Sequence, residues 1–592
     1  MKQFLITVAG VFLGLVLFLV GVPLVLIGMA ASAASPEPPP NEAVLSLDLR
    51  TALADQSPAN PLWGLGRNTH SVMAIVETLD RAEEDDRVKA LFVRLPEGGV
   101  EPAMADEIRG AFVRFRKAGK PIYAHSQGIY PAGVVTTTYM LGAAANQFWM
   151  QPGASLQVTG VATEDLFLKR FFDKYGVLAQ FEQRREYKTA VNSYLTSDYT
   201  PAHRDSTLSW LASVYEANLA AAAADRKTAP AALRASLEAG PYGAEDALRL
   251  KLIDRLGQVR EALDALTKSA GDGDGLEPFD FWDYADSHIE APDLPGDAIA
   301  LIEAEGPILT GGGGEANPFT GSATIYSDDL ANAILRATAT SSIKAIVLRL
   351  NSPGGSDTAS EQVLDAVRAA RAAGKPVVVS MSTYAASGGY WIASGATEIV
   401  AQPTTLTGSI GVYGGKFAVG PALARFGVDV RELGVGGDYA SAFGLGQGFN
   451  PQQRAAFAAW MDRTYEGFIT RVASGRKLAP ERVREIAGGR VWTGAQAKTL
   501  GLVDHLGGFP VAVERARTLA KLEANAPLRR MTPSEGALEA FQNALGVSAM
   551  SARTLAAAAW VMGDPRAEAI LDELTETRLR GQGATVLAPT PW

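Results

Sequence analysis

The sequence predicts an α/β fold in which two tandem copies of a parallel β/α unit follow a single N-terminal transmembrane helix. Three observations carry this prediction: an uncharged apolar run near the start of the chain, an internal repeat at an offset of 250 to 255 residues, and short apolar segments that alternate with amphipathic ones in both copies. Strands that are apolar on both faces and alternate with helices are typical of parallel sheets covered on both sides.

The apolar run is the first predicted element. Residues 4–29 contain no charged side chain and exceed the roughly 20 apolar residues that span a bilayer. The run is also longer than the apolar region of about 7 to 15 residues in a cleaved signal peptide, although small residues that resemble a cleavage site follow it. Lys2 precedes the run and the first charges after it are acidic, which predicts a cytoplasmic N-terminus. We therefore expect a transmembrane signal-anchor at residues 1–31 and a stiff, proline-rich spacer at residues 32–42.

The internal repeat organises the rest of the chain. Segment 88–95 matches segment 343–350, with Lys89 opposite Lys344 at an offset of 255, and the same offset aligns two Ala-Gly-Lys-Pro segments. Chance agreement at this many positions is negligible, so the chain contains a duplication. Farther along, at an offset of 250, the matches pair Pro201, Arg204, Trp210, Tyr215, Glu216, Arg226, Lys227 and Pro230 with Pro451, Arg454, Trp460, Tyr465, Glu466, Arg476, Lys477 and Pro480.

Each copy contains the same series of elements. An apolar strand is followed by a helix, a buried strand, a second helix that ends at Ala-Gly-Lys-Pro, another apolar strand and, later, a long helix. The predicted first strands are residues 43–49 and 298–304, the strands after Ala-Gly-Lys-Pro are 122–124 and 377–380, and the long helices are 201–226 and 451–476.

These elements predict the domain boundaries. We expect an N-terminal repeat at residues 43–270 and a C-terminal repeat at residues 297–524. Residues 271–296, which are rich in Gly, Asp and Pro, are predicted to form a flexible linker, and residues 525–592 a helical C-terminal tail.

Composition excludes several classes of function. The chain of 592 residues carries a formal net charge of -10 and no concentrated basic segment, which argues against a nucleic-acid partner. It has no cysteine, and its five histidines show no metal-binding spacing. No glycine-rich phosphate-binding motif is present. We therefore expect no disulfide, no metal ion and no cofactor.

The strongest candidate for chemistry is Ser387, which lies in TYAASGGYWI about 30 residues after NSPGG. The serine ends a run of small residues and precedes two glycines and an aromatic pair that would begin a buried helix. A serine at a strand-to-helix junction can expose its hydroxyl while nearby backbone N–H groups point at the substrate, which is the geometry that acyl transfer needs. From this segment alone, a tight turn packed under a helix is an equally good interpretation.

The two copies differ at the positions that matter for chemistry. When the copies are aligned on a shared tyrosine, Thr136 takes the place of Ser387 in the first copy, whereas Lys188 of the first copy corresponds to Ala440 of the second. Each copy has thus lost what the other keeps. We infer one composite site, although a surface lysine is the ordinary interpretation of Lys188 taken alone.

A serine and a lysine can work as a pair. A serine hydroxyl needs a neighbouring base, and a lysine can be that base if burial lowers its pKa from about 10.4 so that the amine is neutral. We therefore interpret Ser387 as the nucleophile and Lys188 as the general base. Gly355 and Gly388 are candidates to bring backbone N–H groups to the oxyanion, because glycine permits close approach. Ser409 is a candidate to hold the lysine amine, with a simple turn serine as the alternative.

Four motifs together resemble a known family, and the resemblance covers residues 1 to about 524. The chain closely resembles the signal peptide peptidase A, or protease IV, family in its long duplicated bacterial form. That resemblance implies a ClpP/crotonase-like fold for each repeat and the same roles for Ser387, Lys188 and Ser409. The motifs are NSPGGS at 351–356, YAASGGYW at 384–391, LTGSIGV at 406–412 and YKTAV at 187–191.

The resemblance also implies a location and partners. The expected protein is a single-pass protein of the bacterial inner membrane with a periplasmic catalytic part, and it is a homotetramer that degrades remnant signal peptides and other hydrophobic peptides. Two other functions are considered. Acyl-CoA chemistry of the crotonase type would not explain the pattern of lost and kept residues. A non-catalytic periplasmic scaffold or chaperone for hydrophobic segments would not need an intact Ser387 and Lys188.

Overall fold

The computed structural model describes residues 39–56, 70–271, 276–287, 296–312 and 323–531, together with the backbone of 586–587. The predicted signal-anchor at 1–31 and most of the spacer at 32–42 lie outside the described residues. In the described part of the chain, no helix is both long and apolar enough to cross a membrane.

The first repeat is built on a six-stranded sheet in which every pairing is parallel. Its inner strands are almost wholly buried, as expected for a sheet with helices on both faces. From one edge to the other the strands are β11 (Pro278–Asp280), β1 (Ala43–Asp48), β4 (Val88–Arg94), β5 (Ile122–Ser126), β6 (Gln147–Met150) and β10 (Arg255–Leu256).

The second repeat has the same strand order, which agrees with the duplication inferred from the sequence. Its parallel strands are β23 (Leu528–Arg530), β12 (Ala298–Glu305), β15 (Ile343–Ser352), β17 (Val377–Ala386), β18 (Glu398–Ala401) and β22 (His505–Leu506). The far half of β17 leaves β18 and pairs instead with β19 (Leu406–Gly408), which pairs with β21 (Val491–Thr493). The sheet therefore divides along β17 just before Ser387.

Helices cover both faces of each sheet and form separate hydrophobic cores on the two faces. Met73 of the first repeat belongs to the core under α20, so the two repeats share apolar contacts. In the first repeat, one face of the sheet is covered by α3 (Val72–Glu84), α4 (Pro102–Lys117) and α5 (Thr136–Ala143), and the other face by α11 (Val259–Ala270). In the second repeat, one face is covered by α13 (Ser327–Ala339), α14 (Asp357–Ala372) and α15 (Gly388–Ala393), and the other face by α20 (Phe509–Ala520).

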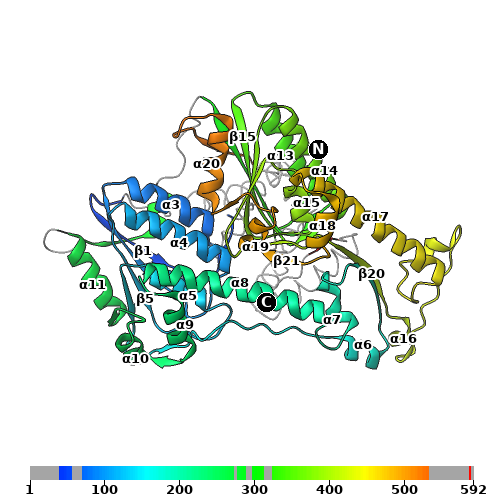
Figure 1. The fold of residues 1–592 in the computed structure, drawn as a ribbon, viewed down its shortest axis with the longest axis horizontal. Helices are drawn as coiled ribbons and strands as arrows, with labels where there is room; N and C mark the ends of the chain where they lie inside the picture. The colour runs from blue at the N-terminus through cyan, green and yellow to red at the C-terminus, as the bar shows by residue number, and fades with distance from the viewer. Residues whose placement is uncertain are drawn as a thin grey trace, which may run out of the picture.

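Two long helices extend from the repeats to the region on the right of Figure 1. We call this region, which contains residues 166–184 of the first repeat and 412–450 of the second, the arm. Helix α8 (Pro201–Asp225) runs from the first repeat along the second, and α17 (Pro451–Arg476) runs outward from the second repeat. In the arm, β8 (Leu178–Arg184) of the first repeat pairs antiparallel with β20 (Val412–Ala418) of the second. This exchange carries the chain that follows β8 across to the second repeat.

Shorter elements complete the described chain. They are β2 (Leu53–Ala54), β3 (His70–Ser71), β7 (Ser155–Leu156), α6 (Lys169–Tyr175), η3 (Thr189–Val191), α7 (Asn192–Leu195), α9 (Pro230–Glu238), β9 (Tyr242–Gly243), α10 (Ala244–Arg249), α12 (Phe281–Asp286), β13 (Ile308–Leu309), β14 (Ile325–Tyr326), β16 (Gly354–Gly355), α16 (Gly420–Ala424), η5 (Asp438–Ser441), α18 (Pro480–Ile486), α19 (Gly494–Thr499) and β24 (Val586–Leu587).

Two predicted boundaries differ from the structure. Part of the predicted linker, 271–296, adds β11 and α12 to the first repeat, and Phe281 and Tyr284 are buried there. The predicted helical tail, 525–592, begins with β23, which is the equivalent edge strand of the second repeat, and its other described segment is β24. The Gly- and Pro-rich surroundings hide these short edge strands in the sequence, because a few residues are enough to extend a sheet that is already formed.

Candidate active site

Ser387 lies at the junction between β17 and α15 and is fully buried. Its backbone has φ 55° and ψ -116°, a region that non-glycine residues rarely adopt and that costs about 1 to 3 kcal/mol. The Ser387 N–H donates to the carbonyl of Gly408 at 2.9 Å, and the Ser387 carbonyl accepts from Trp391 N at 2.8 Å. The strained turn is thus held on both sides, by β19 and by the first turn of α15.

Lys188 of the first repeat reaches Ser387 within the same chain. Its Nζ lies 2.7 Å from Ser387 Oγ, 3.0 Å from Ser409 Oγ and 3.1 Å from the Ser409 carbonyl oxygen. The three side chains are 0% exposed. The composite site inferred from the complementary losses therefore corresponds to one cluster of atoms.

The segment that carries Lys188 is fastened to the second repeat. The backbone N–H groups of Arg185 and Tyr187 donate to the Gly488 carbonyl at 3.3 and 3.1 Å. The next residue, Gly489, packs so closely that a Cβ on it would lie 2.5 Å from Lys188 Cα. Beyond the lysine, Val191 is buried against Tyr413. These contacts hold the Lys188 backbone against the second repeat, next to Gly489.

Burial disfavours the charged form of the Lys188 amine. Removal from water lowers the pKa of the Lys188 amine well below its ordinary value, because the charged form loses its hydration. Within the described residues, no carboxylate forms an ion pair with Lys188 that would restore the charge. A neutral amine has one lone pair and two N–H groups. The lone pair could accept a hydrogen bond from the Ser387 hydroxyl, while the two N–H groups donate to the hydroxyl and the carbonyl oxygen of Ser409.

Ser409 is held in a left-handed conformation beside the lysine. It follows β19 with φ 47°, and its N–H donates to the Arg490 carbonyl at 2.8 Å. This conformation directs both its hydroxyl and its carbonyl at Lys188 Nζ. The turn-serine alternative accounts for the backbone of Ser409 but not for these two side-chain and carbonyl contacts with the amine.

The two candidate oxyanion glycines lie next to each other. A Cβ on Gly388 would lie 2.6 Å from Ser360 Oγ and 3.0 Å from Gly355 N, and a Cβ on Gly355 would lie 2.0 Å from the Ile308 carbonyl oxygen. Only glycine permits these approaches. The backbones of both glycines therefore lie close to each other, beside the turn that carries Ser387.

The equivalent place in the first repeat is filled. Tyr139 and Tyr390 occupy matching positions, since their hydroxyls donate to the carbonyls of Leu252 and Leu502 at 3.1 and 2.9 Å. Next to Tyr139, the Thr137 hydroxyl donates to the Val100 carbonyl at 2.8 Å and accepts from Val100 N at 2.9 Å. The Thr137 side chain thus satisfies both backbone groups of Val100.

A buried charge cluster that was not predicted from the sequence lies against β15 and β17. Arg349 is fully buried and contacts Asp55 and Glu107, both from the first repeat. One signal was present: an arginine within the apolar run of β15 requires a buried partner. The sequence contained no indication of which carboxylates would supply it.

A buried, strained serine within hydrogen-bond distance of a buried lysine amine, on a duplicated α/β fold, is an arrangement that fits a serine peptidase. The chain belongs to Peptidase family S49, whose sequence profile matches residues 114–271 and 369–523, once in each repeat. It is similar to Protease 4 of Salmonella typhi, with 35% identity over 500 residues covering 81% of this chain and 78% of that protein. Protease 4 of Haemophilus influenzae is 30% identical, covering 86% of this chain and 83% of its own. Among solved structures, a ClpP1 variant from Listeria monocytogenes matches 36% of this chain and 94% of its own with 14% identity and a TM-score of 0.23.

Proposed function

We propose that this serine peptidase is a membrane-anchored endopeptidase that uses a Ser387–Lys188 dyad to cleave hydrophobic peptides, among them signal peptides left in the membrane. The observation that carries the proposal is the 2.7 Å distance between Lys188 Nζ and Ser387 Oγ in a fully buried site. At this distance the amine can take the hydroxyl proton directly.

The chemistry follows from the contacts. As Ser387 Oγ attacks the scissile carbonyl, its proton passes to Lys188 Nζ, whose own N–H groups donate to the hydroxyl and carbonyl of Ser409. The ammonium so formed donates a proton to the leaving amine, and a water molecule then hydrolyses the acyl-enzyme by the same route. Backbone N–H groups of Gly355 and Gly388 stabilise the oxyanion, and loss of one such donor typically costs about 10²- to 10³-fold in rate.

The edge strand β16 supports an extended peptide as the substrate. It consists of the glycine pair of the NSPGG motif, and β24 of this same chain pairs with it antiparallel, with Gly354 opposite Leu587 and Gly355 opposite Val586. A strand that accepts one extended segment can accept another through the same main-chain hydrogen bonds. A peptide bound there would run past Ser387.

Anchoring and location rest on the sequence. The uncharged run at residues 4–29 is long enough to span a bilayer, and the charges around it favour a cytoplasmic N-terminus with the bulk of the chain on the other side. The similarity to Protease 4 of two bacteria supports the bacterial inner membrane as the location, with the catalytic part in the periplasm. Anchoring would keep the site near peptides that remain in the membrane. Protease access to the catalytic part from the periplasmic side of spheroplasts, and its absence in inverted vesicles, would test this topology.

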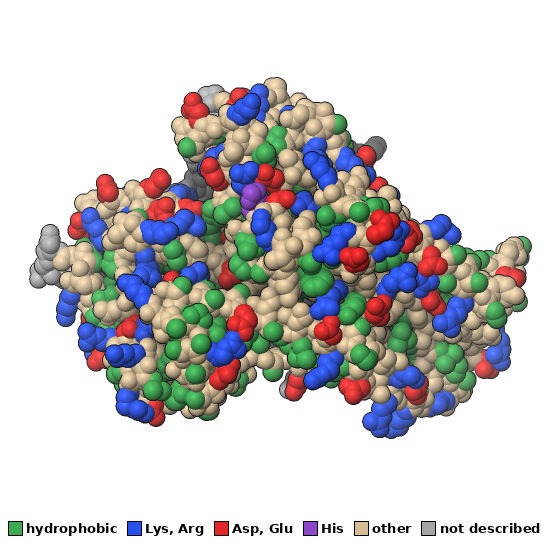
Figure 2. Space-filling model, viewed as in Figure 1, with side chains coloured by type: hydrophobic (Ala, Val, Ile, Leu, Met, Phe, Trp, Pro, Cys, Tyr) green, Lys and Arg blue, Asp and Glu red, His purple; other side chains and the backbone are tan. Residues whose placement is uncertain are grey.

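Exposed apolar side chains on the arm support self-association, for which we propose a homotetramer. Several large hydrophobic residues are more than half exposed there, and Figure 2 shows green hydrophobic side chains at the right-hand end of the molecule. Exposed apolar surface of this kind commonly marks a contact site. The most exposed are Leu166 (80%), Phe171 (55%), Phe426 (79%), Leu433 (101%), Val435 (99%) and Leu445 (64%).

The proposal is tested with the purified full-length protein and an internally quenched apolar peptide. We expect Ser387→Ala and Lys188→Ala each to abolish hydrolysis, because each removes one member of a cooperative pair, while the melting temperature shows that both variants are folded. Mass spectrometry of the products should show internal cleavage. Hydrolysis that survives either substitution, or release of terminal residues alone, would contradict the proposal.

A further inference from the structure

Strand β17 has an irregularity immediately before the nucleophile. Leu350 pairs with Met381 and Ser352 with Ala385, so two steps along β15 correspond to four steps along β17. Residues 382–384 of β17 therefore lie opposite the single residue 351 of β15 and form a bulge with two additional residues. Ser387 follows three residues after the bulge. A bulge redirects a strand and leaves backbone groups without ladder partners, so side chains must hold it in place.

Side chains from three directions hold this bulge. Asn351 Oδ1 accepts from Tyr384 N at 3.1 Å, and the Asn351 amide donates to Glu305 Oε1 at 2.8 Å. The Thr405 hydroxyl donates to the Ser382 carbonyl at 2.7 Å. These contacts come from within the second repeat. The remaining one comes from the first repeat.

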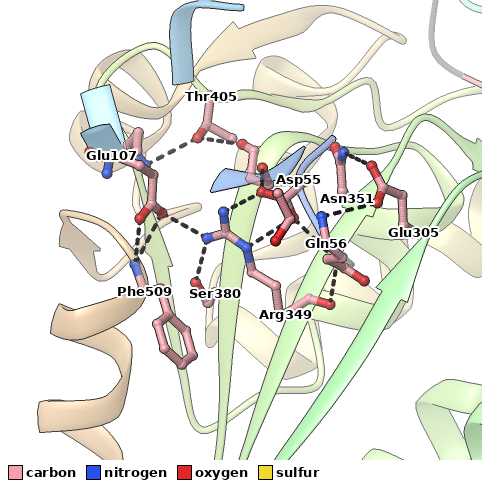
Figure 3. A network of polar contacts seen from close by, with 12 residues as sticks. Asp55, Gln56, Glu107, Glu305, Arg349, Asn351, Ser380, Thr405 and Phe509 are labelled. Carbon is pink, nitrogen blue, oxygen red and sulfur yellow. Dashed lines mark hydrogen bonds and ion pairs between the residues drawn. The ribbon is translucent and has the colours of Figure 1, made fainter. Parts of the chain in front are cut away.

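That remaining contact joins the Ser382 hydroxyl to Asp55, and both side chains are fully buried. Asp55 is itself held by Arg349, whose Nε donates to Asp55 Oδ2 at 3.0 Å, while Nη1 donates to Glu107 Oε1 at 2.7 Å and to Ser380 Oγ at 3.0 Å. Figure 3 shows the Arg349 guanidinium between the two carboxylates. The arginine fixes the orientation of Asp55, because a buried guanidinium keeps its carboxylate partners close.

The equivalent arginine of the first repeat has different partners. Arg94, the equivalent of Arg349 at the offset of 255, donates to Gln127 Oε1 at 2.8 Å and lies 3.8 Å from Asp48, and both partners belong to its own repeat. In the described part of the chain, only the arginine of the second repeat holds a carboxylate that comes from the other repeat. The second repeat is also the one that carries the nucleophile.

We propose that Asp55 is a positioning residue for catalysis: through Ser382 it holds the β17 bulge so that Ser387 Oγ stays in reach of Lys188. The first repeat then contributes twice, with Lys188 for the proton and with Asp55 for the strand that bears the nucleophile. This inference rests on the proposed function of Ser387. It assigns to Asp55 and Ser382 no contact with the substrate.

The variant that isolates this role is Ser382→Ala. It removes the hydroxyl between Asp55 and the bulge but leaves the ion pairs of Arg349 with Asp55 and Glu107. The matched control is Ser380→Ala, which removes a hydroxyl from the same network where β17 is still in register with β15. Both are made in the full-length protein, and Asp55→Asn is added as a third variant.

We expect Ser382→Ala to lower kcat by about 10-fold or more with KM little changed, since small displacements of a reacting group have effects of that order. The rate at which a fluorophosphonate probe modifies Ser387 should fall by the same factor. Ser380→Ala should keep kcat and the labelling rate within about twofold of the wild type. Asp55→Asn should lose at least as much activity as Ser382→Ala, and the double variant no more than Asp55→Asn alone.

Two results would overturn the inference. One is wild-type kcat and labelling in Ser382→Ala; the other is an equal loss in Ser380→Ala, which would mean that the network acts through stability alone. If Asp55→Asn does not fold, the two serine variants still decide. Labelling of the wild type, and its loss in Ser387→Ala, is measured first. If the wild type is not labelled at Ser387, the proposed function fails, whereas labelled wild type with unaffected Ser382→Ala refutes only the role of Asp55.

Discussion

The burial of Lys188 has a thermodynamic consequence that can be measured without any substrate. Lys188 is 0% exposed, and burial lowers the pKa of its amine well below its ordinary value. In the unfolded chain the same amine titrates near pH 10.4. Between these two pKa values the unfolded state binds one more proton than the folded state, so the stability of the folded state increases with pH. Where the amine is neutral in the folded state and charged in the unfolded state, one proton corresponds to about 1.4 kcal/mol of stability per pH unit, which is the upper limit of the slope.

The perturbation that removes this dependence is Lys188→Met, which fills a similar volume with a side chain that does not titrate. We would introduce it into Ser387→Ala, which keeps the lysine and prevents self-digestion. Urea unfolding followed by tryptophan fluorescence gives the free energy of unfolding at each pH. We expect the gain in unfolding free energy caused by Lys188→Met to be largest at pH 7 and to shrink towards pH 9, by up to about 1.4 kcal/mol for each pH unit.

A control locates the effect at this lysine. Lys344→Met, in the same background, removes a side chain that is 41% exposed and whose amine lies 3.3 Å from a carboxylate oxygen of Asp297. Because water still reaches that amine, its removal should change stability by a nearly constant amount across the range. If the difference caused by Lys188→Met is also constant between pH 7 and pH 9, Lys188 is not held neutral and cannot be the base.

Three further predictions follow from the same geometry. First, kcat/KM should rise with pH as the Lys188 amine loses its proton and then level off, because only the neutral amine accepts the Ser387 proton; a rate that still rises at about pH 10.4 would indicate a solvated lysine. Second, Gly489→Ala should reduce kcat by about 10-fold or more, because the added Cβ would displace the Lys188 backbone. Gly374→Ala is its control, since Gly374 has a similar positive φ of 82° with nothing within 4 Å of the added atom, and activity should be kept there. Third, removal of residues 586–592 should lower KM for peptides several-fold, because β24 must leave β16 before a substrate strand can pair there; an unchanged KM would show that the two do not compete.

Much of the fold could be predicted from the sequence because its signals are local. The apolar runs of β1, β12 and β15 and the long helix α17 lie where periodicity and the repeat put them. Short edge strands such as β11 and β23 could not be predicted, since two or three residues carry no periodicity and form a strand only against an existing sheet. For the same reason the predicted linker at 271–296 includes residues that form β11 and α12 in the structure.

The sequence by itself determined the duplication, the position of Ser387 at a strand-to-helix junction and the complementary loss that singles out Lys188, because each is a pattern in the order of residues. Only the tertiary structure decided that the lysine and the serine meet within one chain, that no carboxylate among the described residues pairs with the buried amine, and that Asp55 reaches the strand that leads to Ser387. Burial and proximity across 199 residues of sequence separation are set by how the two repeats pack, and no local pattern encodes them.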